Sequence, residues 1–100
     1  MPSRDALPDN QIHAALPEGW SVQDTPVGNR ITREFRFSNF RTAMGFIVRV
    51  GFEAEAMDHH PELFNVYDRV AIALTTHDAG NRVTETDLEL ARRLNALADG

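Results

Sequence analysis

The 100-residue sequence contains neither cysteine nor lysine. Without cysteine the chain can form no disulfide framework and no thiolate nucleophile, and this composition is compatible with a reducing, cytoplasmic location. Every basic residue is an arginine, and acidic residues outnumber them to give a net charge of −5. Nothing in the sequence resembles a basic patch with interleaved aromatic residues. We therefore expect no direct nucleic-acid binding, because phosphate contacts dominate that affinity.

Long hydrophobic runs are also missing. No segment approaches the roughly 18 consecutive apolar residues of a membrane-spanning helix, so we expect no membrane insertion. The opening segment MPSRDALPDNQ has no apolar stretch of the kind found in secretory signals, and no leader is expected. The motifs GxSxG and GxGxxG and the phosphate-binding P-loop do not occur, which leaves hydrolases and nucleotide-binding proteins of those classes without support.

What the chain does contain is an ordinary globular composition, with 42% apolar and 25% charged residues. No linker, repeat or low-complexity segment interrupts it, so residues 1–100 are expected to form a single domain. The apolar spacing and the positions of proline and glycine divide this domain into seven elements. These are a helix over 10–16, strands over 20–23 and 30–37, a helix over 39–58, strands over 63–67 and 70–76, and a final helix opened by Thr84–Asp87.

Two of these elements carry predictions about which side chains face the core. In the second strand Ile31 and Phe35 alternate with polar residues, although Arg33 interrupts the apolar face. In the long helix Ser38 is expected to cap the N-terminus, and Pro61 follows the C-terminus. The apolar stripe expected for that helix consists of Phe40, Met44, Ile47, Val48, Gly51 and Ala54.

The element order is α-β-β-α-β-β-α with two hairpin-like strand pairs, and strands joined by hairpins are antiparallel. This order predicts a two-layer α+β fold, in which a four-stranded antiparallel sheet carries three helices on one face. The other face of the sheet and its edge strands stay open to a second copy of the chain, so we expect a homo-oligomer.

The stretch MDHHP, residues 57–61, places two adjacent histidines at the expected end of the long helix. If the helix persists to this point, Glu55 and His59 lie at positions i and i+4 on one face. A neighbouring carboxylate fixes the tautomer of an imidazole, and both the carboxylate and the helix dipole favour the protonated ring. This environment suits a proton donor.

A third histidine is expected to reach the same place. His77 is expected on the strand face that carries Ala73 and Thr75, whose small side chains leave room for a ligand. A tight turn returns this strand antiparallel to the preceding one, toward the end of the long helix. We therefore expect His59, His60 and His77 to line one concavity.

Each of these residues also has an ordinary interpretation. Adjacent histidines at a helix end are commonly surface residues, Asp87 is positioned to cap the last helix, and Tyr67 suits a half-buried strand. Three histidines with a carboxylate can also bind zinc or iron. However, the side chains of His59 and His60 diverge, and the HExxH spacing is absent. Metal-free acid–base chemistry is therefore the favoured interpretation.

The joint pattern from Trp20 to the final helix resembles that of the pterin-4a-carbinolamine dehydratase family. It is carried by the segments EAMDHHPELFNVYDRV and LTTHD, and within the pattern by Glu55, His59, His60, Pro61, Tyr67, His77 and Asp87. The resemblance implies a two-layer α+β fold whose sheet pairs across a homodimer, or within a homotetramer. It also implies dehydration of a 4a-hydroxytetrahydropterin to quinonoid dihydropterin, with no further cofactor. This reaction recycles the cofactor of aromatic amino-acid hydroxylases.

The resemblance further implies roles for individual residues. It assigns His59 and His77 to proton transfer at the 4a-hydroxyl group, and His60 mainly to substrate binding. Glu55 and Asp87 are implied to orient the imidazoles. The implied substrate-binding set is completed by Asp58, Pro61 and Tyr67.

A second function stays open at this point. Some relatives with this fold have lost histidines and serve as assembly factors for other enzymes, so a non-catalytic interaction or assembly module is the alternative. This chain keeps all three histidines of the pattern. It departs from the family at Leu63, where a tryptophan is common, and this change is expected either to loosen the rim of the pterin pocket or to alter the preference among pterins.

Overall fold

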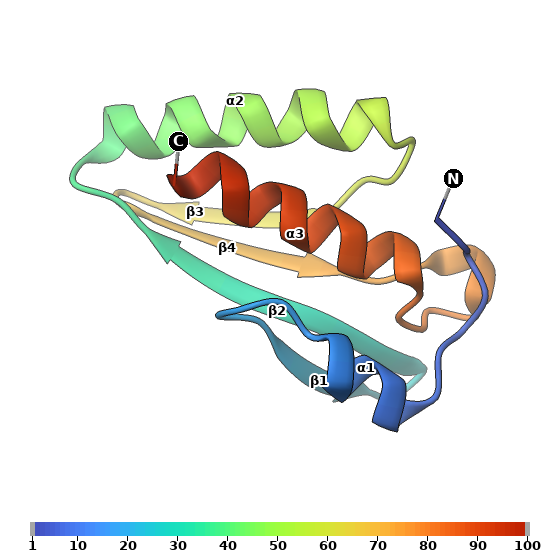
Figure 1. Cartoon of the computed structure of the whole chain (residues 1–100). Coiled ribbons are helices and arrows are strands. Elements are labelled where there is room, and N and C mark those ends of the chain that lie inside the picture. Colours follow the sequence, from blue (N-terminus) through green and yellow to red (C-terminus); the bar gives the residue numbers. More distant parts are fainter. Residues whose placement is uncertain (1, 100) are drawn as a thin grey trace.

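The computed structural model describes residues 2–99 of the chain (Figure 1). Its helices and strands follow the expected order α-β-β-α-β-β-α. They are α1 (Asp9–Ala15), β1 (Ser21–Thr25), β2 (Gly28–Arg36), α2 (Phe40–Ala56), β3 (Glu62–Val66), β4 (Arg69–Leu74), the short 3-10 helix η1 (His77–Ala79) and α3 (Glu85–Asp99). Within the described residues no helix is long and apolar enough to cross a membrane.

The four strands formed by residues 2–99 make one sheet in the order β1-β2-β4-β3, and each neighbouring pair is antiparallel. β2 pairs with both β1 and β4, so Ile31 lies opposite Val22 on one side and Leu74 on the other. α2 and α3 pack against each other over one face of this sheet (Figure 1), and α1 joins the same core through the fully buried Ile12. The predicted two-layer α+β fold is confirmed.

Period-two alternation decides which side chains of the central strands are buried. Ile31 and Phe35 of β2, together with Ile72 and Leu74 of β4, lie under the helices and are almost inaccessible. Arg33 interrupts this face in the sequence. Its guanidinium lies over the Phe35 ring, 4.3 Å from the ring centre, in a cation–π contact at the margin of the core. The alternate residues point away from the helices and leave the other side of the sheet open.

The core-facing side of α2 differs from the expected stripe. The buried residues of this helix are Ala43, Phe46, Val50 and Ala54. Of the residues predicted to face the core, Phe40 is 47% exposed and Val48 is 57% exposed, so the predicted stripe is largely wrong. The reason is that apolar residues occur around most of the circumference of α2. A second apolar face, which includes Phe52 at 76% exposure, competes with the buried one in the sequence pattern.

Both ends of α2 also differ from expectation. The N-cap is Asn39 rather than Ser38, because the Asn39 side chain accepts a hydrogen bond of 2.8 Å from the Thr42 backbone N–H. The helix ends at Ala56, short of the expected end at Asp58, and Asp58 has a φ of 49°. A left-handed residue cannot continue an α-helix, so the chain turns at this point. The turn sets the directions of the two histidines that follow.

Candidate functional site

The two adjacent histidines enter different environments at the turn after α2. Asp58 is left-handed, and the His59 backbone N–H donates a hydrogen bond of 3.0 Å to the Ala54 carbonyl. The His59 side chain lies inside the protein and is 6% exposed, whereas His60 is at the surface. The two rings therefore diverge, as the sequence interpretation assumes.

The buried side chain of His59 pairs with Asp87 of α3. His59 Nε2 lies 2.5 Å from Asp87 Oδ1, and Asp87 is fully buried. The other carboxylate oxygen accepts hydrogen bonds from the Thr84 backbone N–H and the Thr76 hydroxyl, each at 2.8 Å. A buried carboxylate is tolerated when its oxygens are paired in this way. Asp87 therefore caps α3, as its sequence position indicates, and also orients the His59 imidazole.

Glu55, the predicted partner of His59, lies elsewhere. Because α2 ends at Ala56 and the chain turns at Asp58, His59 does not occupy the i+4 position on a helical face. Glu55 Oε1 is instead 2.8 Å from His60 Nε2, and the side chains of Glu55 and His60 are 78% and 63% exposed. The predicted Glu55–His59 pair is wrong. Glu55 holds His60 through a solvent-exposed contact, which contributes little to stability.

His77 reaches the site from η1 rather than from a strand. β4 ends at Leu74, and His77 is exposed at the start of η1. Its Nδ1 lies 2.6 Å from the side-chain oxygen of Asn81, a residue in the left-handed region with a φ of 60°. The prediction that His77 lies on the strand face is wrong, because the strand stops before it. The loop after β4 places the ring instead, with Asn81 as its anchor.

The three histidines nevertheless line one cavity of about 230 Å³. Its lining consists of Arg4, Asp58, His59, His60, Thr75, Thr76, His77 and Asp78. Segments far apart in the sequence thus meet where α2 and β4 end. Imidazoles, carboxylates, hydroxyls and a guanidinium around one hollow can bind a polar heterocycle and transfer protons to and from it.

Four of the expected site residues do not line this cavity. Asp87 and Glu55 contact the imidazoles of His59 and His60. Pro61 stands between His60 and the start of β3. Tyr67 is 63% exposed in the turn between β3 and β4, at the far end of β3 from His60. At roughly 3.3 Å per strand residue, the length of β3 separates Tyr67 from the histidines of the same chain.

Two further side chains at the site are not indicated by the sequence pattern. Arg4 Nη1 lies 3.3 Å from His59 Nδ1, and Arg4 Nη2 donates hydrogen bonds of 3.0 Å to the carbonyls of Met57 and Asp58. Arg4 and His59 are 55 positions apart, and no local pattern relates them. Asn81 has a weak signal, since it belongs to a Gly-Asn dipeptide of the kind that marks turns.

The ring nitrogens of the two adjacent histidines contact different partners. His59 and His60 each direct Nε2 to a separate carboxylate, so these two atoms do not converge on one point. Among residues 2–99 no group of three or more histidine, cysteine, aspartate or glutamate side chains is arranged to hold a metal ion.

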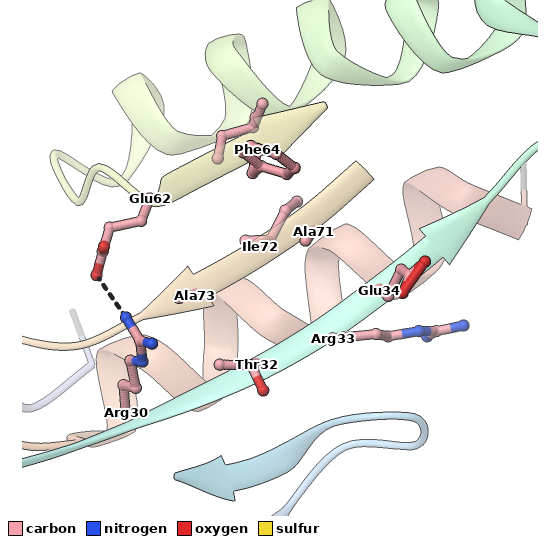
Figure 2. A pocket seen from close by; sticks show the side chains of 10 residues that line it. Arg30, Thr32, Arg33, Glu34, Glu62, Phe64, Ala71, Ile72 and Ala73 are labelled. Carbon is pink, nitrogen blue, oxygen red and sulfur yellow. Dashed lines mark hydrogen bonds and ion pairs between the residues drawn. The ribbon is translucent and has the colours of Figure 1, made fainter. Parts of the chain in front are cut away.

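A larger hollow of about 470 Å³ lies on the open face of the sheet (Figure 2). Figure 2 shows Ala73 of β4 near the ion pair in which Arg30 of β2 lies 3.5 Å from Glu62 of β3, and Ala71 farther along β4, where it is the register partner of Phe64. A third hollow of about 210 Å³ is lined by Arg30 and Glu62 and also by His77, so the open face leads to the histidine cavity. Imidazoles, which exchange protons near neutral pH, line the smaller cavity and, through His77, part of the third hollow.

Comparison with protein families and with named proteins gives a consistent result. The family model for pterin 4 alpha carbinolamine dehydratase matches residues 5–97. A protein of Opitutus terrae that bears the name "Putative pterin-4-alpha-carbinolamine dehydratase" is 49% identical over 81 residues, which make up 81% of this chain and 79% of that protein.

Two solved structures are similar to this one. A crystal structure described as a transcriptional coactivator/pterin dehydratase from Brucella melitensis is 42% identical with a TM-score of 0.83, and the match covers 94% of this chain and 99% of that chain. A pterin dehydratase-like protein, identified as a RuBisCO assembly factor in the alpha-carboxysome, is 23% identical with a TM-score of 0.68, and the match covers 81% and 90% of the two chains. At that lower identity the likeness shows the fold alone.

Proposed function

The chain belongs to the pterin 4 alpha carbinolamine dehydratase family, and from this premise we propose that it is a hydro-lyase acting on a 4a-hydroxytetrahydropterin. The reaction removes water from the carbinolamine and yields quinonoid dihydropterin. In this role the protein recycles the pterin cofactor of aromatic amino-acid hydroxylases.

The observation that carries this proposal is the convergence of His59, His60 and His77 on one cavity. Loss of the tertiary hydroxyl needs a proton delivered to the leaving oxygen and a proton removed from a ring nitrogen. The carbon–oxygen bond breaks as a carbon–nitrogen double bond forms, and the hydroxyl leaves as water. Imidazoles suit both proton transfers, and each positioned transfer typically contributes about 10²–10⁴-fold to the rate.

His59 is the proposed base. Its Nε2 contacts Asp87, which is fully buried, so Nδ1 is the ring nitrogen on the side of the cavity. A histidine that donates its Nε2–H to a carboxylate has an unprotonated Nδ1. Arg4 Nη1 lies 3.3 Å from that nitrogen, so Nδ1 can accept the proton from the pterin ring nitrogen once the substrate takes the place of Arg4 Nη1. The Asp87 carboxylate then stabilises the imidazolium that forms.

His77 is the proposed acid. Its Nδ1 is paired with the side-chain oxygen of Asn81 and therefore acts as a donor. The protonated ring carries a second proton on Nε2, which is available for the leaving hydroxyl group. Asn81 fixes the ring so that this nitrogen, and not Nδ1, meets the substrate.

His60 is proposed to bind the substrate rather than to transfer the proton. Its Nε2 is held by Glu55 at the exposed edge of the cavity, where the ring can contact a flat ligand. Asp58 and Pro61, the residues on either side of the histidine pair, complete the proposed binding set. Tyr67 stays a prediction from the family resemblance.

The ultraviolet assay of synthetic carbinolamine tests this function. We expect the protein to accelerate loss of the carbinolamine above its spontaneous rate, and a chelator to leave that rate unchanged. His60→Ala is expected mainly to raise KM. His13→Ala is a matched control, because His13 is exposed on α1 outside the cavity. Inhibition by the chelator would favour the metal alternative.

An interaction or assembly module is the second candidate function. It is favoured by large apolar side chains that the fold leaves at the surface, which are unusual for a protein without partners. They include Phe40, Val48 and Phe52 on α2, and Phe64, Val66 and Tyr67 on and after β3. Equal rates of carbinolamine loss with and without the protein would favour this second function.

The same exposed surfaces support a homodimer or homotetramer. β3 lies at the edge of the sheet, where a second copy can pair with it. Light scattering of the purified protein measures the oligomeric state, and a monomer would contradict this part of the proposal. The cytoplasmic location and the lack of nucleic-acid binding stay predictions.

A further inference from the structure

The lining of the histidine cavity includes the guanidinium of Arg4, which comes from the segment before α1. We propose that Arg4 is a positioning residue: it holds the turn that presents His59 and His60, and it keeps the ring proton of His59 on Nε2. The effect on turnover rests on the proposed dehydratase function. The effects on the turn and on the imidazole do not depend on that function.

The first part of the proposal concerns the turn. Arg4 Nη2 donates to the carbonyls of Met57 and Asp58, which follow the last residue of α2. Carbonyls at a helix C-terminus have no intrahelical partner, and a cation there also interacts favourably with the helix dipole. Asp58 is in the left-handed region, which a residue other than glycine occupies only when its surroundings hold it there. Arg4 supplies that restraint directly before the two histidines.

The second part concerns the His59 ring. An arginine side chain has five N–H donors and no acceptor, so the contact of 3.3 Å between Arg4 Nη1 and His59 Nδ1 requires Nδ1 to be the acceptor. The ring proton then lies on Nε2, where Asp87 accepts it. Arg4 and Asp87 thus select the same tautomer from opposite sides of the ring. In this tautomer the lone pair lies on Nδ1, where it accepts from Arg4 until a substrate N–H takes the place of that contact.

The third part concerns what holds Arg4 in place. The Thr86 backbone N–H and hydroxyl both donate to the Ser3 carbonyl, at 3.1 and 2.9 Å. The Leu7 backbone N–H donates to the Val83 carbonyl at 3.0 Å. The segment is therefore fixed to the first turn of α3, which also carries Asp87. The segment before α1 therefore contacts both His59, through Arg4, and the first turn of α3, through Ser3.

The effect on turnover is tested by Arg4→Ala and Arg4→Lys. A misplacement of about 1 Å can cost on the order of 10²-fold in rate, so Arg4→Ala is expected to lower kcat by about 10- to 100-fold. KM is expected to change little, because the proposal gives Arg4 a role in positioning the turn and the His59 ring rather than in binding. Lysine keeps the charge without the planar fork, so Arg4→Lys is expected to fall between wild type and alanine. Guanidinium ion at non-denaturing concentration is expected to restore part of the activity of Arg4→Ala.

The effect on the ring is tested without substrate by ¹H–¹⁵N spectra of protein labelled at histidine. The wild type is expected to show His59 with a protonated Nε2 and a hydrogen-bonded, unprotonated Nδ1. In Arg4→Ala the Nδ1 signal is expected to move toward that of a ring nitrogen without a hydrogen bond. Arg41→Ala is the matched control, because Arg41 is exposed in the first turn of α2, at the opposite end of that helix. Its His59 signals should match those of the wild type.

Two results would overturn the role of Arg4: a protonated Nδ1 in the wild type, or identical His59 signals in the wild type and Arg4→Ala. If Arg4→Ala does not fold, Arg4→Met, which keeps an unbranched stem but has no N–H donor, carries the same comparison, and an unchanged Nδ1 signal there overturns the proposal. A wild-type protein without dehydratase activity would contradict the proposed function only, since the spectra need no pterin. A loss of kcat without guanidinium rescue and without a change at Nδ1 would assign Arg4 a purely structural role.

Discussion

Replacement of Asp87 by asparagine tests the buried pair on which the histidine cavity depends. The substitution keeps the shape of the side chain but removes its charge and one acceptor. Asp87 faces the His59 ring with one oxygen, and with the other it faces the Thr84 backbone N–H and the hydroxyls of Thr76 and Thr84. An asparagine oxygen can keep the contacts with the two threonines, and its NH₂ group then meets the N–H of the ring.

The expected cost follows from these contacts. Two donors that face each other leave a buried group unsatisfied, which costs about 1–3 kcal/mol, and loss of the charge weakens the remaining bonds by about 1 kcal/mol. A shift of the His59 proton to Nδ1 does not relieve the clash, because that proton would meet the Arg4 guanidinium. We therefore expect the free energy of unfolding to fall by about 2–4 kcal/mol, which corresponds to roughly 10–30 °C in Tm for a domain of this size.

Urea unfolding followed by circular dichroism measures this change at 25 °C. Asp24→Asn is the matched control, because Asp24 is exposed on β1, and it should stay within about 0.5 kcal/mol of the wild type. The folded fraction of Asp87→Asn is also expected to lose about 10²-fold or more in kcat, because the His59 base is no longer oriented. An Asp87→Asn protein with the unfolding free energy and kcat of the wild type would refute the reasoning.

Three further perturbations have defined outcomes. Gly28→Ala is expected to lower the free energy of unfolding by about 1–3 kcal/mol in urea, because its Cβ would lie 2.1 Å from the Asn81 backbone oxygen. Phe46→Ala is expected to cost about 3–5 kcal/mol by the same measurement, since Phe46 is fully buried. A hydrogen bond from Arg93 lowers the pKa of Glu89 below its ordinary 4.5, so its contribution is present above pH 4.5 and is lost as the pH falls through the lowered pKa. The loss is expected to be small in acid titrations of stability, because the pair is partly exposed and screened by solvent.

Control variants distinguish these specific effects on stability from nonspecific effects of substitution. Gly51→Ala meets no atom within 4 Å and is expected to be neutral, or stabilising by up to about 1 kcal/mol. Phe52→Ala removes a side chain that is 76% exposed and should leave the stability of one subunit nearly unchanged. Glutamine does not titrate, so in Glu89→Gln the part of the acid-induced loss of stability that comes from Glu89 should be absent. If Gly51→Ala destabilises as much as Gly28→Ala, the backbone contact at Asn81 is not the cause.

The parts of the fold that were predictable are those with a single dominant period. β2 shows alternate apolar residues, and its central residues Ile31 and Phe35 are buried as that pattern indicates. α2 has a helical period, but apolar residues occur on two of its faces, so the pattern does not select Phe46 over Val48. Only packing against the sheet and α3 distinguishes the two faces.

The parts of the site that were not predictable depend on one backbone angle and on distant contacts. The three histidines could be grouped because the antiparallel return of the strand before His77 brings it toward the end of α2, and their joint spacing also resembles that of a known family. The partner of His59 could not, because Asp58 is not glycine, and an aspartate is only a weak signal of a left-handed turn. Asp87 is 28 positions from His59, and Arg4 is 55 positions away. Contacts over such separations exist only once the helices have packed.

The most direct test of the acid–base assignment is the dehydration rate of His59→Ala and His77→Ala, measured by ultraviolet absorbance on samples with the wild-type fold and oligomeric state. We expect each variant to lose about 10²–10⁴-fold in kcat/KM relative to the wild type. Wild-type rates in both variants would contradict the assignment of the two imidazoles as base and acid, and with it the proposed mechanism.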